Sequence, residues 1–143
     1  MCMYQRDYIL RMIEMLARLI AGILKLIKSG DMNQASQALQ NAYGVAFQHE
    51  SLTLKTIPEE ELIETLLQVH NYTTGHLEML AELFYAEAEL LLAEKKFAES
   101  LPLFRKSLAL YEHIDREYRS YSQERQDRMK AIRERLADES LKL

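Results

Sequence analysis

Glycine and proline, the residues that most often interrupt helices, are scarce in this chain. Its 143 residues include four glycines and two prolines, while 48% are apolar. So few breaks leave room for only a handful of turns, and a sheet fold would need more of them. We therefore predict a single all-α domain over residues 1–143, built from about six helices in antiparallel helix-turn-helix pairs around one core.

Local signals place the ends of these helices. Gly30 followed by Asp31 is typical of one helix ending and the next beginning. Thr56-Ile57-Pro58-Glu59 has the spacing of a capping box, which predicts a helix start near Ile57. The prediction is repeat-like helix pairs over residues 4–48 and 76–114, an irregular middle over 49–75 with one helix at 57–69, and a C-terminal helix over 116–137.

The first helix is apolar over most of its circumference. Its charged residues recur every three or four positions and so share one narrow stripe: Arg11, Glu14, Arg18 and Lys25, together with Gly22. Four charges within this stretch argue against a membrane-spanning helix. The remaining apolar surface must be covered by other parts of the chain or by a second copy.

Charge is unevenly distributed along the chain. The 18 basic and 22 acidic residues give a net charge of −4, which disfavours a nucleic-acid partner because counterion release needs a concentrated basic face. Residues 50–100 hold eleven glutamates against three lysines, whereas residues 101–143 hold ten basic against eight acidic residues. Attraction between these two segments is one consequence we expect.

No residue pattern typical of an enzyme or a metal site stands out. The four histidines are dispersed, with only His113 and Glu117 at ligand spacing, and the chain lacks a glycine-rich phosphate loop. We therefore predict no catalytic residues, no metal and no cofactor. The single cysteine, Cys2, permits no disulfide within the chain, and the opening residues lack a signal-peptide pattern. These features predict a cytoplasmic protein without a membrane partner.

A shift of 65 residues superposes the two helix pairs. Small and large side chains coincide, because Ala35 falls on Ser100, Leu39 on Phe104 and Ala42 on Ser107. The second pair resembles the tetratricopeptide repeat (TPR) family over residues 82–114, and the first resembles it more weakly over 17–49. The residues that carry this resemblance are Ala88, Leu91, Phe97, Ser100, Phe104, Ser107 and Leu108.

The family resemblance implies a right-handed superhelical arrangement of helix pairs. Serine replaces the usual alanine at Ser100 and Ser107, and no proline closes either repeat. We expect both serines to be enclosed between helices, with hydroxyls bonded to carbonyls one turn earlier. The opening segment Tyr4–Glu14 is also similar to the start of a family of short bacterial proteins of unknown role.

Four residues of the 76–95 helix share one stripe at i, i+4, i+7 and i+11: Glu78, Glu82, Tyr85 and Glu89. In TPR proteins the corresponding stripe lines the concave groove that binds peptides. The resemblance therefore implies an acidic groove with one aromatic residue, which would select a protein or peptide partner with a basic segment. A solvated helix face is the alternative interpretation, since glutamate is a strong helix former.

Glu87 differs from these residues because it shares a face with Leu80, Phe84 and Leu91. A buried carboxylate needs a donor or a proton. The candidates are Arg105, a tyrosine hydroxyl or a helix terminus, and a ligand-binding or catalytic role is the alternative.

The sequence favours a non-enzymatic helical interaction module or adaptor in the bacterial cytoplasm. The alternative is a self-associating structural homo-oligomer whose apolar surface is covered by its own C-terminal helix or by a dimer mate. The 65-residue shift places Ala17, Ile20 and Leu24 where Glu82, Tyr85 and Glu89 stand, so part of the expected groove is apolar. Such a surface should be covered.

Overall fold

The computed structural model describes residues 2–118 and 121–138. Every regular element in this part of the chain is helical, which confirms the all-α prediction. The α-helices are α1 (Cys2–Lys28), α2 (Met32–Phe47), α3 (Ser51–Lys55), α4 (Leu62–Gln68), α5 (Thr74–Ala93), α6 (Phe97–Glu117) and α7 (Gln123–Ala137), with 3₁₀ turns at Gln48–Glu50 and Glu59–Glu61.

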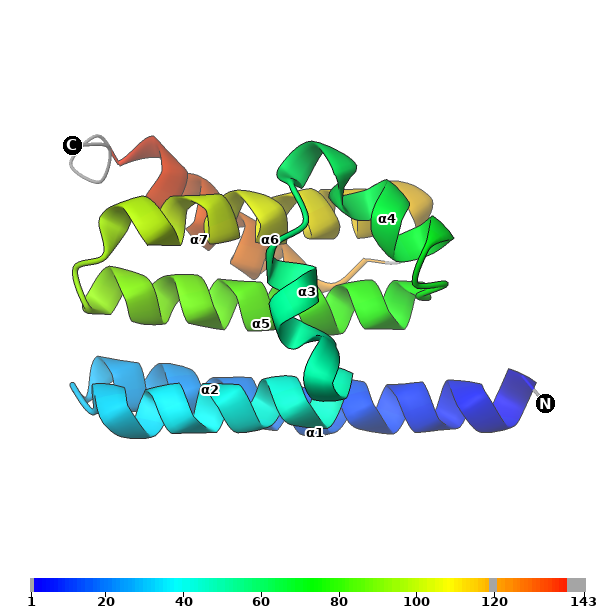
Figure 1. Cartoon of the computed structure of the whole chain (residues 1–143), viewed down its shortest axis with the longest axis horizontal. Coiled ribbons are helices and arrows are strands. Elements are labelled where there is room, and N and C mark those ends of the chain that lie inside the picture. The colour runs from blue at the N-terminus through cyan, green and yellow to red at the C-terminus, as the bar shows by residue number, and fades with distance from the viewer. Residues whose placement is uncertain (1, 119–120, 139–143) are drawn as a thin grey trace.

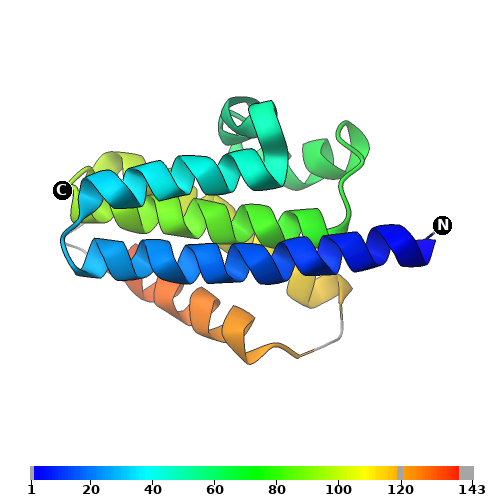
Figure 2. The same ribbon diagram turned by 90° about the horizontal axis from the view of Figure 1, so that it is seen from below.

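Two antiparallel helix pairs, α1–α2 and α5–α6, stack on each other (Figure 1). α5 is the central helix, since it packs against α1, α2 and α6 and is buried along most of its length. The short helices α3 and α4 cross one side of the stack, and α7 lies on the other (Figures 1 and 2). The N-terminal part of α1 extends beyond the neighbouring helices (Figure 2).

The turns within the two pairs have the same hydrogen-bond geometry. Gly30 has a positive φ of 82°, and its N–H donates to the carbonyl of Ile27 at 3.0 Å. At the position 65 residues later, Lys95 has a φ of 64° and donates to Leu92 at the same distance. This left-handed conformation is the expected end of a helix. The first helix of each pair thus ends in the same type of turn.

The small positions of the repeat are also buried as predicted. Ala35, Ala42, Ser100 and Ser107 are all fully enclosed. The Ser100 hydroxyl donates to the carbonyl of Phe97, at 2.8 Å, as expected within a helix. The expectation for Ser107 is wrong, because its hydroxyl reaches across to the carbonyl of Ala81 in α5, at 2.7 Å. The hydroxyl thereby links α5 and α6 where they approach closely.

Two predicted helix starts are wrong. Thr56 does not cap the following helix, because its hydroxyl donates backwards to the carbonyl of Thr53. Pro58 is extended with a ψ of 147°, so a 3₁₀ turn intervenes and α4 begins at Leu62. The C-terminal helix, predicted to begin at residue 116, begins at Gln123. Ser122 caps this helix, because its hydroxyl accepts the N–H of Arg125 at 3.2 Å.

The charged stripe of α1 lies on the surface as predicted, with Arg11, Glu14, Arg18, Gly22 and Lys25 all exposed. Among the helices described here, none is long and apolar enough to cross a membrane. The opposite side of α1 packs into the core through Leu16, Ile20 and Ile23.

We predict that Ser100→Leu lowers the free energy of unfolding by about 1–3 kcal/mol, because no space exists for a larger side chain between α5 and α6. The matched change at the exposed neighbour, Glu99→Leu, should alter it by less than about 0.5 kcal/mol. Urea denaturation of both variants measures the difference. Equal stabilities would contradict the packing described for this helix pair.

Candidate functional site

The acidic stripe predicted on α5 faces α7. Glu82 and Glu89 form ion pairs with arginines of α7, and Tyr85 lies beneath one of these arginines. Glu78 lies at the end of the stripe, in a small pocket shared with the start of α7. The structure therefore brings the predicted residues together, and it places the chain's own C-terminal helix against them.

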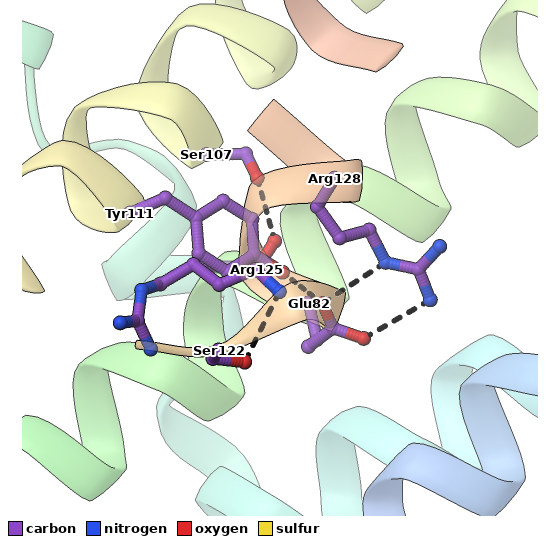
Figure 3. Close-up of polar contacts among 7 residues, drawn as sticks. Glu82, Ser107, Tyr111, Ser122, Arg125 and Arg128 are labelled. Atoms are coloured by element: carbon purple, nitrogen blue, oxygen red, sulfur yellow. Dashed lines mark hydrogen bonds and ion pairs between the residues drawn. The ribbon is translucent and has the colours of Figure 1, made fainter. Parts of the chain in front are cut away.

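Two bidentate pairs join α7 to α5. Arg128 donates from Nε to Oε2 of Glu82 at 3.1 Å and from Nη2 to Oε1 at 3.3 Å (Figure 3). Arg135 donates to both carboxylate oxygens of Glu89 at 2.9 Å. Both the arginines and the glutamates are seven residues apart, so the two helices run in the same direction with matched spacing. The planar guanidinium group suits this two-point contact.

Two further pairs join the other edge of α7 to α6. Arg125 donates from Nε to Oδ1 of Asp115 at 2.5 Å, and Arg133 donates to Glu112 at 3.1 Å. The residue order is reversed, because the earlier arginine pairs with the later carboxylate. α7 therefore runs antiparallel to α6 while it runs parallel to α5.

A narrow apolar seam lies between these two edges. Met129 and Ile132 of α7 are buried, and Ala131 and Leu136 are partly buried against the core. Burial of one such large side chain stabilises docking by about 1.5–3 kcal/mol. The ion pairs of α7 range from the part-buried Arg125–Asp115 to the exposed Arg133–Glu112, and they fix register and direction.

Aromatic groups complete the surface around Glu82. The Arg128 guanidinium carbon lies 4.7 Å from the ring centroid of Tyr85, within the range of a cation–π contact. The hydroxyl of Tyr111, which is fully buried in α6, donates to Glu82. Burial, together with the Glu82 carboxylate, raises the pKa of Tyr111 well above its usual value. For Arg128, burial favours the neutral form, but the Glu82 carboxylate outweighs it and raises the pKa.

A pocket lies where α7 begins, between α7, the middle of α1 and the N-terminal half of α5. Its walls are apolar on the α1 side and polar on the α7 side: Ile13, Leu16, Ala17, Glu78, Met79, Glu82, Tyr111, Ser122, Glu124 and Arg125. Burial raises the pKa of Glu78, and nearby Glu82 and Glu124 act in the same direction against Arg125. α7 thus leaves this end of the acidic stripe incompletely filled and brings the like charge of Glu124 to it.

Glu87 is half-buried on a different side of α5. The Tyr43 hydroxyl donates to its Oε1 at 2.5 Å, and Lys55 Nζ lies 3.4 Å from its Oε2. Among the donors considered from the sequence, the structure thus supplies a tyrosine hydroxyl and adds a lysine from α3. These contacts join α2, α3 and α5 at one point.

A stacked aromatic cluster was not predicted from the sequence. The Tyr72 ring lies 4.6 Å from His76 and 5.1 Å from His70 between centroids, and its hydroxyl donates to Glu50 at 2.8 Å. His76 Nδ1 accepts the backbone N–H of Thr73 at 3.0 Å and so takes part in a capping box for α5. The detectable signal was the Thr73-x-x-His76 spacing, with histidine in the position usually held by glutamate or glutamine.

We predict that acidification destabilises the protein partly through His76. Burial lowers its pKa below the usual 6.5, so only the unfolded state takes up this proton at first, and stability falls as the pH drops below about 6.5. His76→Gln keeps an acceptor but does not titrate. Its loss of melting temperature between pH 7.5 and 5.5 should therefore be smaller than that of the wild type or of the exposed control His49→Gln. An unchanged pH dependence in His76→Gln would contradict this role.

No group of three or more His, Cys, Asp or Glu side chains suited to a metal ion occurs within residues 7–118 and 121–138.

Comparison with known proteins identifies one family, DUF6483, described as a family of unknown function, which matches residues 3–138. The chain belongs to this family. The match extends from α1 to the end of α7, so a DUF6483 domain includes the C-terminal helix as well as both helix pairs. No curated protein and no solved structure was found to match.

Proposed function

We propose that this chain is a non-enzymatic helical interaction module of the bacterial cytoplasm, which binds a protein partner through the acidic face of α5. We define this acidic face as Glu78, Glu82, Tyr85 and Glu89. The single observation that supports the proposal most is the way α7 lies on it, with two arginines in bidentate contact with Glu82 and Glu89. The acidic face is suited to a basic helical segment, so a partner with such a segment has matching chemistry.

The repeat-like helix pairs add to this proposal. The turns after α1 and α5 share their geometry, and the sequence of α5–α6 resembles a tetratricopeptide repeat. In that family the equivalent stripe of the first helix lines a peptide groove. By this resemblance, the α5 surface would bind a peptide as the first helix of a tetratricopeptide repeat does.

Self-association is a second candidate, because α1 exposes large apolar side chains. Tyr8 and Leu10 are more than half exposed near its N-terminal end, and Ala17 is exposed beside α7. Of the three α1 residues expected in the groove, Ile20 is buried in the core and Leu24 is partly buried. A dimer mate that covers α1 would remove this apolar surface from water.

Partner capture from the native host tests the main proposal. The immobilised full chain should retain a protein that is lost with Glu82→Gln and Glu89→Gln, because these changes remove the charge of the acidic face while preserving side-chain shape. Glu60→Gln and Glu64→Gln are the matched control, since both glutamates are exposed outside this face. The purified partner should then bind more weakly as salt rises.

Identical sets of captured proteins from the two double variants would contradict the main proposal. Sedimentation of the purified chain as a stable dimer, reversed by Leu10→Glu, would favour self-association instead.

A further inference from the structure

The contacts of α7 specify what kind of helix the acidic face can hold. In α7, Arg128 is followed by Met129, then by Ile132 three residues later and by Arg135 after another three. The two arginines bind α5, and the two apolar residues are buried in the core. The pattern is a pair of arginines seven residues apart, with an apolar seam between them.

We propose that α7 is an exchangeable occupant of the acidic face, and that the partner is an amphipathic helix of another protein that carries this pattern and displaces α7. This inference rests on the function proposed above and adds the shape of the partner and the means of its regulation.

The seven-residue spacing follows from helix geometry. Glu82 and Glu89 are separated along the axis of α5 by about 10.5 Å, given a rise of about 1.5 Å per residue. A helix that lies parallel to α5 must present its cations at the same separation. Because each guanidinium contacts both oxygens of its carboxylate, an arginine fixes the approach more strictly than a lysine does.

α7 is held by few buried apolar side chains, together with the buried Arg125 that pairs with Asp115. Only Met129 and Ile132 are buried among its apolar side chains, and the outer pair Arg133–Glu112 is largely exposed. Tyr118 and Ser122 are both extended, so α7 is a separate helix from α6. Helices with few buried contacts open most easily from a folded protein.

α7 is also an imperfect occupant. Its Glu124 lines the same pocket as Glu78 and opposes the favourable charge of Arg125 there, and Ile13 and Ala17 of α1 form an apolar wall. A partner with a basic residue at the position of Glu124 would place its aliphatic stem along this wall and its charge near Glu78. Such a partner would bind the acidic face better than α7 does.

A second copy of the chain is a weaker occupant than another protein. Its α7 would make the same contacts as the resident helix, but it would lack the high effective concentration that the short connection gives to the resident one. Displacement therefore requires a helix with better contacts.

Binding of synthetic peptides to the full chain tests this inference. The probe is a fluorescent peptide of residues 121–138, measured by anisotropy. The double variant Arg128→Gln, Arg135→Gln weakens the hold of α7, so it should bind the probe at least tenfold more tightly than the wild type does. The matched control Lys130→Gln, Lys28→Gln removes two exposed positive charges elsewhere and should bind as the wild type does.

Two altered peptides test the pattern itself. Exchange of Glu134 and Arg135 in the probe keeps its composition but changes the arginine spacing to six, and should remove most of the binding. Glu124→Lys in the probe should increase affinity for both the wild type and the double variant by at least threefold. Circular dichroism of each protein variant checks that its helical content is retained.

Equal binding of the probe by the wild type and the double variant would overturn the exchange of α7, and equal binding of both arginine spacings would overturn the partner pattern. The inference would also be overturned if the wild-type chain formed a dimer in solution in which the two copies exchange their α7 helices. The occupant of the acidic face would then be a second copy instead of another protein. None of these results alters the capture experiment above, which depends only on the charges of Glu82 and Glu89. The two proposals can therefore fail separately.

Discussion

The fold depends on how the carboxylates of a largely buried central helix are neutralised. α5 packs on three sides against other helices, yet Glu82, Glu87 and Glu89 lie on it with little solvent around them. A charged group in such a position is costly unless a partner of opposite charge or a hydrogen-bond donor reaches it. Each of these glutamates has such a partner, and the donors come from four other helices. The placement of α2, α3, α6 and α7 around α5 is thus tied to these three carboxylates.

The glutamates on the two sides of α5 are neutralised by different kinds of helix. Glu87 is held by Tyr43 and Lys55, whose helices α2 and α3 are well anchored in the core through residues such as Leu39 and Leu54. Glu82 and Glu89 are held by a helix that has few apolar contacts of its own. One side of α5 is therefore joined to helices with many buried apolar side chains, while the other is joined to a helix with few. This asymmetry is the basis of the function that we propose.

Local sequence signals were sufficient for much of the fold. Gly30 identified the end of α1, and the 65-residue alignment placed Ser100 and Ser107 at a buried helix contact, because close packing requires small residues wherever it occurs. The misplaced start of α4 shows where such signals fail. Thr56 has the right spacing for a capping box, but its hydroxyl finds an acceptor in the preceding turn.

The candidate site was only partly accessible from sequence. The spacing of Glu78, Glu82, Tyr85 and Glu89 defines a stripe on any helix, so their common face could be predicted. The pairing of Glu82 and Glu89 with Arg128 and Arg135 could not, because each pair joins residues 46 positions apart and depends on how α7 packs against α5. The uneven charge of residues 50–100 and 101–143 indicated that the two segments attract each other. It did not indicate which arginine pairs with which glutamate.

Amide hydrogen exchange of the wild-type chain tests the central claim most directly. If α7 is an exchangeable occupant of the acidic face, its amides should exchange through local opening, faster than those of α5 and α6. Arg128→Gln with Arg135→Gln should then accelerate exchange in α7 and leave α6 unchanged. Exchange of α7 at the same rate as α5 in the wild type, through global unfolding alone, would show that α7 is a fixed part of the core and contradict the account.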